Sequence, residues 1–580
     1  TADAGPGGQG DRARHGRGGR PVGAAGLLQS IPFWWGVCLL TAAIHAWAHG
    51  HAMNPDGLAY LDMATEALRN GPASLVNGLW SPAFPALLGA ALSLIRPSPA
   101  AEFPFAHVVN FMAYCLALLS FTFFLKSWQQ VGREGNQQVE SGHETPLGFS
   151  AFLWFTIQFI GLKVVSPDLL MAAFVFLAAG LCCRIQTDGS GWKRLAALGA
   201  VLGAGYYVKA PMFPLGLLLL ALLFVWPPSR NFSRRGLLIS AGVFGVVSVP
   251  LVVLLSGQVG RFSLGESGRL NYAWHVNGLA QMVWLGHDGG ALGTPIHPPR
   301  TILDKPLVLE FGTPVKGTYP LWYDPCYWYA GAKTRISLSE QLLALKRNAS
   351  DFWWATQLQT ILIGGALALL ALGGLRRSSV MPSRLGVALI VWACTACGLL
   401  ALVHVEFRYV AAFLVPAWLA LYRWLGRNAE PAVRRAAFVT VALVLTVQLA
   451  ADLPGLAGAA VARNRGGAQP VYIQVAEGLR AAGVKRGDRL ATAGLALDAY
   501  YARFNRSRVV AHLMRPGAGP NLTAEDWGKV KASLARIGVT ALVARQRPVD
   551  ALPGDWQDLK VTGQDHYSVM MIPGTGDRTN

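Results

Sequence analysis

Uncharged, apolar runs long enough to cross a lipid bilayer recur along this chain of 580 residues. About 20 apolar residues in a helix span the hydrocarbon core of a bilayer, where charged side chains are costly. Only 14% of the residues are charged and 53% are hydrophobic, whereas soluble globular chains carry roughly 25% charged residues. We therefore predict a polytopic α-helical membrane protein. This composition excludes a purely soluble enzyme, a fibrous protein and a disordered scaffold.

The apolar runs predict about eleven transmembrane helices. The first run, 27–48, lacks a clear small-residue cleavage site, so we expect a retained span rather than a signal peptide. Residues 1–26 are rich in glycine and arginine and are predicted to be a disordered basic cytoplasmic tail. The remaining runs are 103–125, 148–163, 169–185, 195–208, 210–227, 237–256, 355–375, 385–403, 409–425 and 436–452.

The positive charges alternate between short loops in a way that predicts the topology. The net charge is +19, and cytoplasmic loops of membrane proteins collect Arg and Lys, so we expect no nucleic-acid partner. With the N-terminus inside, the outer turns hold only Lys163, Lys209 and Arg408, and an odd number of spans places the C-terminus outside. The expected location is a bacterial inner (cytoplasmic) membrane. The predicted inner segments hold Arg12 to Arg20; Lys126 and Arg133; Arg184, Lys193 and Arg194; Arg230, Arg234 and Arg235; Arg376, Arg377 and Arg384; and Arg423, Arg427, Arg434 and Arg435.

Three longer segments fall outside under this topology. Segments 49–102 and 257–354 are outer loops of a transmembrane domain over 27–454, and 82–95 is too short to span, so it is predicted to be an interfacial helix. Segment 455–580 has the composition of a soluble protein and predicts an extracytoplasmic α/β domain. Its expected helices are 471–482 and 523–537, and its expected strands are 489–493, 508–512, 539–544 and 567–572.

Ionisable residues gather on the predicted outer face, where a chain this poor in charge is expected to place its chemistry. Each has a structural alternative: the aspartates could cap helices, the lysine could snorkel to the interface, and the HVEFRY turn could hold a local ion pair. Taken together, a carboxylate could act as general base, and the cations could stabilise a departing lipid phosphate. The candidates are Asp56 and Tyr60 in NPDGLAYLDMA, Asp168 in VVSPDLLMA, Lys209, and His404, Glu406, Arg408 and Tyr409 in HVEFRY.

The order of these motifs resembles the GT-C superfamily of membrane glycosyltransferases. The similar branch includes the protein O-mannosyltransferases and the lipid A aminoarabinose transferase. The resemblance implies a GT-C-like fold and inverting transfer of a sugar from a polyprenyl-phosphate donor to an acceptor hydroxyl. Asp56 would be the general base, Asp168 the second acid, and Lys209 and Arg408 candidates for the carrier phosphate.

The same resemblance leaves the acceptor and the cofactor open. This chain has NPDG where the protein O-mannosyltransferases carry an Asp-Glu pair, so a protein acceptor is not supported over a glycan or a lipid. No cofactor is assigned, and members of the superfamily differ in their need for a divalent metal ion. We expect a concave site, open to the bilayer and large enough for a sugar.

Two other functions fit parts of the sequence. An O-antigen-ligase-like transferase would use Arg269, His275 and Arg300 in the long loop, whereas a transporter or flippase of lipid-linked sugars would show internal repeats, and none is visible. The loop's aromatic residues are interpreted as an interfacial belt, with stacking on a sugar or acceptor as the alternative. They are Trp274, Trp322, Tyr323, Tyr327 and Trp328, accompanied by His275.

Overall fold

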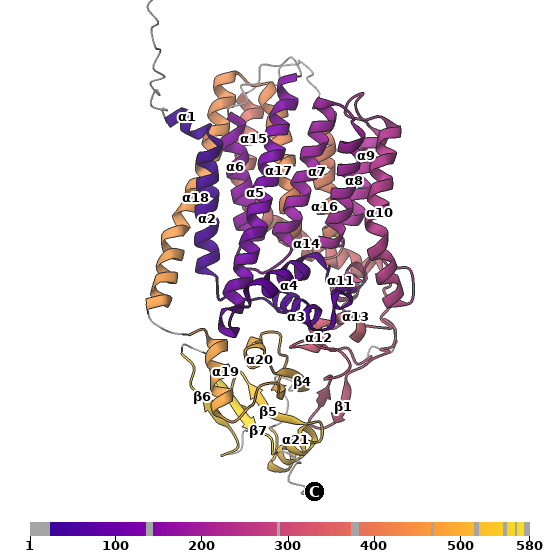
Figure 1. Cartoon of the computed structure of the whole chain (residues 1–580), viewed down its shortest axis with the longest axis vertical. Helices are drawn as coiled ribbons and strands as arrows, with labels where there is room; N and C mark the ends of the chain where they lie inside the picture. Colours follow the sequence, from indigo (N-terminus) through magenta and orange to yellow (C-terminus); the bar gives the residue numbers. More distant parts are fainter. Residues whose placement is uncertain are drawn as a thin grey trace, which may run out of the picture.

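The structure is a computed structural model in which a helical bundle ends against a smaller sheet domain (Figure 1). The prediction of a polytopic helical protein with a C-terminal α/β domain is thereby confirmed. The end of the bundle that faces the sheet is called the sheet end below. The residues that the structure describes are 24–134, 143–286, 290–372, 382–465, 469–514, 521–548, 554–562 and 565–573.

Across the part of the chain that the structure describes, every apolar run that was expected to span the membrane is mainly helical, but several of the helices are short. In the described residues, 7 helices are long and apolar enough to cross a bilayer alone, or up to 8 if a pair bent by 70° counts as one span. The count of eleven is therefore not established. The seven are α2 (Ile31–Ala48), α5 (Glu102–Glu134), α7 (Asp168–Asp188), α10 (Arg234–Val259), α16 (Arg384–Ala401), α17 (Phe407–Arg427) and α18 (Pro431–Arg465).

The other expected spans form shorter elements within the same bundle (Figure 1). They are α6 (Glu144–Trp154), α8 (Trp192–Val208), α9 (Met212–Val225) and α15 (Thr360–Leu372). A π-helical turn over Phe155–Ile160 continues α6. Lys209 and Pro211 separate α8 from α9, because proline lacks the N–H group that would continue the preceding helix.

Helix α15 forms the bent pair with α14 (Leu338–Gln357). Most of α14 lies in the expected outer loop 257–354, so a helix of this length was not predicted there.

Most of the predicted disordered tail, 1–26, cannot be compared with the structure, because residues 1–23 lie outside the described residues. Its last three residues belong instead to the short helix α1 (Ala24–Leu28), where the sequence AAGLL is apolar and no longer basic.

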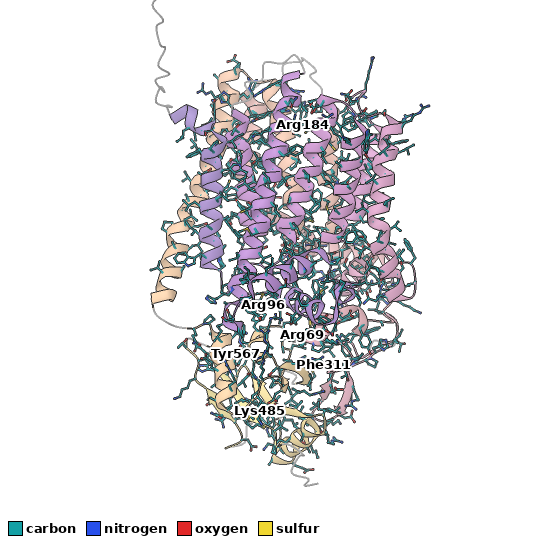
Figure 2. The ribbon with its side chains drawn as sticks, viewed as in Figure 1. Arg69, Arg96, Arg184, Phe311, Lys485 and Tyr567 are labelled. Atoms are coloured by element: carbon teal, nitrogen blue, oxygen red, sulfur yellow. The ribbon has the colours of Figure 1, made fainter. Side chains whose placement is uncertain are left out.

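Two helices lie between the bundle and the sheet, α3 (Pro55–Asn70) and α4 (Ala83–Ile95) (Figure 1). Helix α4 is the apolar segment that was too short to span. Helix α3 begins at Pro55, whose fixed φ suits a first helical position, and it carries Asp56 in its first turn. Figure 2 shows Arg184, near the end of α7, at the opposite end of the bundle. The start of α7 therefore lies at the sheet end.

The sheet has seven strands in the described residues, in the order β1-β2-β4-β3-β5-β7-β6. The central strands β4, β3 and β5 are parallel, and the outer pairings are antiparallel. Strands β1 (Arg300–Leu303) and β2 (Val308–Glu310) come from the long loop 257–354 and were not predicted. The others are β3 (Arg489–Ala493), β4 (Arg508–Leu513), β5 (Val539–Ala544), β6 (Gln557–Leu559) and β7 (Tyr567–Met571).

Short helices complete the sheet end. Helix α21 (Ala524–Arg536) starts with a capping box in which Thr523 and Asp526 exchange hydrogen bonds with each other's backbone N–H groups. The remaining helices are α11 (Ser267–His275), α12 (Pro320–Tyr323), α13 (Pro325–Trp328), α19 (Val471–Ala481) and α20 (Tyr500–Phe504).

A buried ionic network fastens the sheet domain to the bundle. The Arg503 guanidinium of α20 donates to Glu102 of α5 at 2.8 Å and to Asp62 of α3 at 2.7 Å. Asp62 also accepts from the backbone N–H and the hydroxyl of Thr318, at 2.7 and 2.8 Å. Since buried charges are stable only when paired and hydrogen-bonded, this network fixes where α3 sits.

Candidate functional site

Arg408 brings the two candidate aspartates together. Its Nη2 donates to Asp56 Oδ2 at 3.0 Å, and its Nε lies 3.7 Å from Asp168 Oδ2. Asp56 stands in the first turn of α3, Asp168 begins α7, and Arg408 is the second residue of α17. Three helix starts that are distant in sequence therefore place two carboxylates around one guanidinium.

Lys209 adds a second cation. Its Nζ donates to Asp168 Oδ1 and lies 3.3 Å from the centroid of the Tyr409 ring, a cation–π contact. Burial lowers the pKa of Lys209 to about 8, against the opposing effect of the Asp168 charge, and the Arg408 charge lowers it further. This ammonium therefore loses its proton at a lower pH than an exposed lysine does.

Asp168 is fully buried and has a partner on each carboxylate oxygen. Besides its two cationic neighbours, the hydroxyl of Ser166 donates to Oδ2 at 2.9 Å. Its position at the first residue of α7 is also favourable for an anion because of the helix dipole. The carboxylate is thus held in place by charge and by hydrogen bonds rather than serving as a simple cap, since the N-cap is Pro167.

Two further residues of the HVEFRY turn, His404 and Glu406, lie next to Arg408. Glu406 lies 3.4 Å from the Arg408 guanidinium and 3.6 Å from His404 Nε2. Burial alone would raise the pKa of Glu406, but the hydrogen bond from His404 and the Arg408 charge lower it below its usual value. His275 stacks on His404 with ring centroids 4.0 Å apart.

Two tyrosines predicted to bind substrate enclose the charges. Tyr409 lies between the two cations, with Arg408 Cζ 5.1 Å from its ring centroid. Tyr60 is buried and packs edge-on against Trp80 and Phe84. Burial, together with the charges of the nearby aspartates, raises the pKa of Tyr60 well above its usual value, so its phenol stays protonated.

All eight residues that were proposed from the sequence are therefore accounted for. Seven form a connected set of ion pairs and ring contacts, called the charged cluster below, and Tyr60 packs beside it. The charged cluster consists of Asp56, Asp168, Lys209, His404, Glu406, Arg408 and Tyr409.

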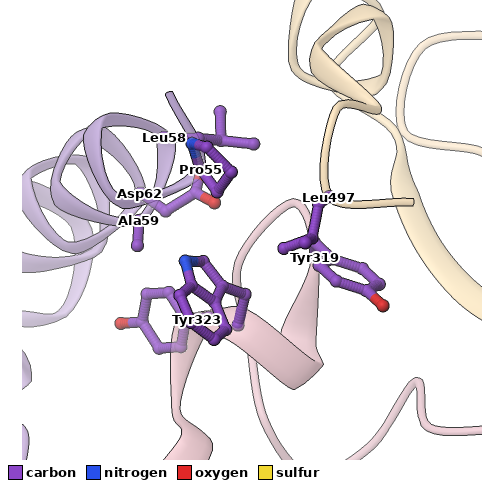
Figure 3. Close-up of a pocket in the computed structure, with 8 residues that line it drawn as sticks. Pro55, Leu58, Ala59, Asp62, Tyr319, Tyr323 and Leu497 are labelled. Carbon is purple, nitrogen blue, oxygen red and sulfur yellow. The ribbon is translucent and has the colours of Figure 1, made fainter. Parts of the chain in front are cut away.

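A pocket large enough for a sugar was expected at these residues. The cavity next to Pro55 has a volume of about 10 Å³, which is about the room for one water molecule. Figure 3 shows that it lies between α3 and residues Tyr319, Tyr323 and Leu497. No residue of the charged cluster lines it, and in this structure the two cations are already paired with carboxylates. A bound anion would therefore share these cations with their carboxylate partners or compete with them.

The other acids of the first outer loop serve the attachment of the sheet domain. Asp62 pairs with Arg503, as described above, and Glu66 pairs with Lys316 at 2.5 Å. Their role was not visible in the sequence, because both partners lie more than two hundred residues away. Only the acid in the Pro-Asp-Gly turn joins the charged cluster.

The residues of the ligase-like alternative have separate partners. Arg269 pairs with Glu266 at 2.5 Å, Arg300 pairs with Glu310 at 3.3 Å, and His275 belongs to the edge of the charged cluster. The structure therefore provides no contact that unites the three in one site.

The aromatic residues proposed for the belt differ in burial. Trp274 and Trp328 are buried, and Trp274 stacks on Trp322 with ring centroids 6.0 Å apart. The interpretation as an interfacial belt is wrong for these two residues, because a belt needs rings exposed to the bilayer surface. They form the core beneath the outer loops instead.

The described residues contain no group of three or more His, Cys, Asp or Glu side chains arranged to hold a metal ion. Sequence comparison adds no assignment, since no protein-family model and no curated protein matches the chain.

Solved structures do resemble it. The apo structure of ArnT from Cupriavidus metallidurans matches with a TM-score of 0.52 and 13% identity, covering 94% of this chain and 99% of that chain. The same protein bound to undecaprenyl phosphate gives a TM-score of 0.48 at 12% identity, covering 94% and 98%. Archaeal oligosaccharyltransferase AglB from Archaeoglobus fulgidus gives 0.47 at 13% identity, covering 88% and 69%. At these identities the likeness to the first structure shows the fold alone.

Proposed function

From the fold that this chain shares with the GT-C superfamily of membrane glycosyltransferases, we propose that it is itself a membrane glycosyltransferase. It moves a sugar from a polyprenyl-phosphate carrier to an acceptor hydroxyl, with inversion at the anomeric carbon. The observation that carries the proposal is the charged cluster, which places two carboxylates and two cations together at one end of a membrane bundle.

Each group of the cluster has a chemical task in this reaction. Asp56 accepts the proton of the acceptor hydroxyl as that oxygen attacks the anomeric carbon. The bond between this carbon and the phosphate oxygen breaks, and the phosphate leaves with the electron pair. Arg408 and Lys209 stabilise the charge that develops on it. Asp168 holds both cations in place through the contacts described above.

The pairing of Asp56 with Arg408 fits this sequence of events. A phosphate bound by the guanidinium competes with the Asp56 carboxylate for the same N–H donors, and a carboxylate freed in this way is a stronger base. The ArnT whose apo structure shares the fold has also been solved with undecaprenyl phosphate. We propose the same class of carrier for this chain.

The proposed site faces the exterior of a bacterial inner membrane. This orientation is supported by the basic residues of the short loops, such as Arg184 at the end of the bundle opposite the sheet (Figure 2). The donor would reach the cluster from the bilayer, and the acceptor would arrive from the aqueous side.

The decisive experiment is Asp56→Asn in the purified full-length protein. General bases contribute roughly 10²–10⁴-fold to rate, so we expect transfer from a polyprenyl-phosphate sugar to fall by that factor or more. Asp498→Asn, at a half-exposed position in the sheet domain, is the matched control. An unchanged melting temperature confirms that the fold is intact, and full activity of the Asp56 variant would remove this residue from the mechanism.

The release of free polyprenyl phosphate distinguishes a glycosyltransferase from a transporter of the lipid-linked sugar. A flippase moves the lipid-linked sugar intact, whereas a transferase produces free polyprenyl phosphate in step with sugar transfer. Chromatography of the lipid product therefore decides between the two.

A further inference from the structure

A groove of about 470 Å³ lies between the long loop and the edge of the sheet, apart from the charged cluster. We propose that it binds a carbohydrate, namely sugars of the acceptor that lie away from the reacting hydroxyl. The identification of the sugars as part of the acceptor rests on the proposed function. The prediction that the groove binds a carbohydrate does not depend on it. The groove is lined by Ile296, His297, Pro298, Arg300, Glu310, Thr313, Tyr327 and Trp328.

The polar wall of the groove is rigid. Glu310 is only 9% exposed, and its carboxylate is held by the guanidinium groups of Arg300 and Arg489, each at 3.3 Å. It also accepts the backbone N–H of Gly312 at 3.2 Å. Strands β1 and β2 carry Arg300 and Glu310 as a directly opposed pair, so the sheet itself fixes their positions. Fixed donors and acceptors of this kind favour binding, because little side-chain freedom is lost.

The aromatic wall is equally fixed. The rings of His297 and Tyr327 stack with centroids 4.1 Å apart, and Tyr327 meets Trp328 edge-on at 5.0 Å. Trp328 is buried behind the other two rings, and the partly exposed His297 and Tyr327 rings suit the C–H faces of a sugar. The neighbouring hydroxyl, carboxylate and guanidinium groups suit its hydroxyls. The volume falls in the usual range of about 300–1,000 Å³ for small-molecule sites.

Glu310 pairs with both Arg300 and Arg489, so one carboxylate stands between two guanidinium groups. A free anion would meet this carboxylate as well as the cations, whereas the hydroxyls of a neutral sugar can both accept from the guanidinium groups and donate to the carboxylate. The groove also lies beside β1, on the sheet domain and off the membrane helices (Figure 1), so the ligand arrives from water and not from the lipid.

A chain of contacts leads from the groove toward the charged cluster. Trp328 contacts Phe311, whose ring centroid lies 5.8 Å from that of Tyr319. Tyr319 in turn lines the small cavity beside Pro55 (Figure 3), the neighbour of the proposed base. Under the proposed function, sugars held in the groove orient the acceptor through remote binding energy.

The test is saturation-transfer NMR on the full-length protein in nanodiscs, with a panel of linear hexose and pentose oligosaccharides of two to four residues at millimolar concentration. We expect at least one to bind. Arg300→Ala and Ile296→Trp should each weaken its binding at least about ten-fold, the first by removing donors and the second by filling the groove. Arg545→Ala and Ile336→Trp are controls at exposed positions outside the groove and should bind as the wild type does.

The outcomes separate the two proposals. If no oligosaccharide binds, if a phosphorylated sugar binds while the neutral panel does not, or if the groove variants bind normally, the groove inference is overturned. Asp56→Asn should retain sugar binding while losing transfer. An active Asp56→Asn protein whose sugar binding still depends on Arg300 would refute the catalytic role and leave the carbohydrate site standing.

Discussion

At the scale of single residues, Arg408 defines the site, because it is the group that contacts Asp56, Asp168 and Glu406. Three carboxylates around one guanidinium would repel one another without it. The sequence HVEFRY marked this arginine as unusual, since it stands at the start of an apolar helix. What no local pattern could reveal was the identity of its partners.

Lys209 leads to a prediction about pH. With a pKa of about 8, instead of the usual 10.5, its charge disappears as the pH rises past 8, and phosphate binding should weaken over this range. The folded protein loses this proton before the unfolded chain does, so the same group makes the free energy of unfolding rise between about pH 8 and 10.5. Binding of a short-chain polyprenyl phosphate, measured from pH 6 to 10, tests the first effect.

Lys209→Arg is the informative comparison. An arginine stays charged throughout this range, so the weakening above pH 8 should disappear in the variant. Identical pH profiles for the two proteins would show that another group is responsible.

At the scale of elements, helix α3 performs two tasks on different turns. Its first turn carries Asp56 toward the bundle, and its second carries Asp62 toward the sheet domain. A helix start at Asp56 was one alternative that the sequence left open. The second role of this helix, through Asp62, was not expected, because Arg503 lies in a short helix that carries no strong sequence signal.

The Arg503 network should be essential for stability. Arg503→Met leaves Asp62 buried without its cation, while Glu102 keeps Arg506, and breaking a buried ion pair in this way costs roughly 3–5 kcal/mol. Thermal unfolding in detergent should show a lower melting temperature. Arg545→Ala removes a largely exposed arginine and serves as the control, with an expected change within about 0.5 kcal/mol. Equal stability of the two variants would contradict the role of the network.

Local pattern predicts some elements of this protein well and misses others. Alternating or continuous apolar residues identified β3, β4, β5 and β7, which are long enough to show a period. Strand β2 has three residues and joins the central strands of the sheet by pairing with β4, some two hundred residues later. Such pairing is a property of the fold and leaves no trace in the short segment itself.

At the scale of the whole molecule, the predicted orientation follows from the basic residues of the short loops. It can be checked in a cysteine-free background by introducing Lys485→Cys in the sheet domain, where Figure 2 labels this residue. A membrane-impermeant maleimide added to intact spheroplasts should label it. Lys193→Cys, near the start of α8, should react only after the membrane is permeabilised. The reverse pattern would invert the topology and place the charged cluster inside.

The general plan could be predicted because membrane insertion is encoded residue by residue, through hydropathy and charge. The number of spans could not, because α6, α8 and α9 are shorter than a bilayer is thick and depend on their neighbours for their place in the bundle. The candidate site was predictable in part. The candidate residues were identifiable, but the pairings that hold them, such as Ser166 with Asp168, required the folded chain.

The participation of β2 in the sheet limits how this protein can be divided. Strand β4 has β3 on one side and β2 on the other, so a soluble fragment that begins near Pro470 would expose a row of open backbone donors and acceptors along β4. An unpaired strand edge of this kind can form hydrogen bonds with strands of other molecules, which leads to aggregation. An expression fragment meant to behave well in solution would need the hairpin 300–310 grafted onto it.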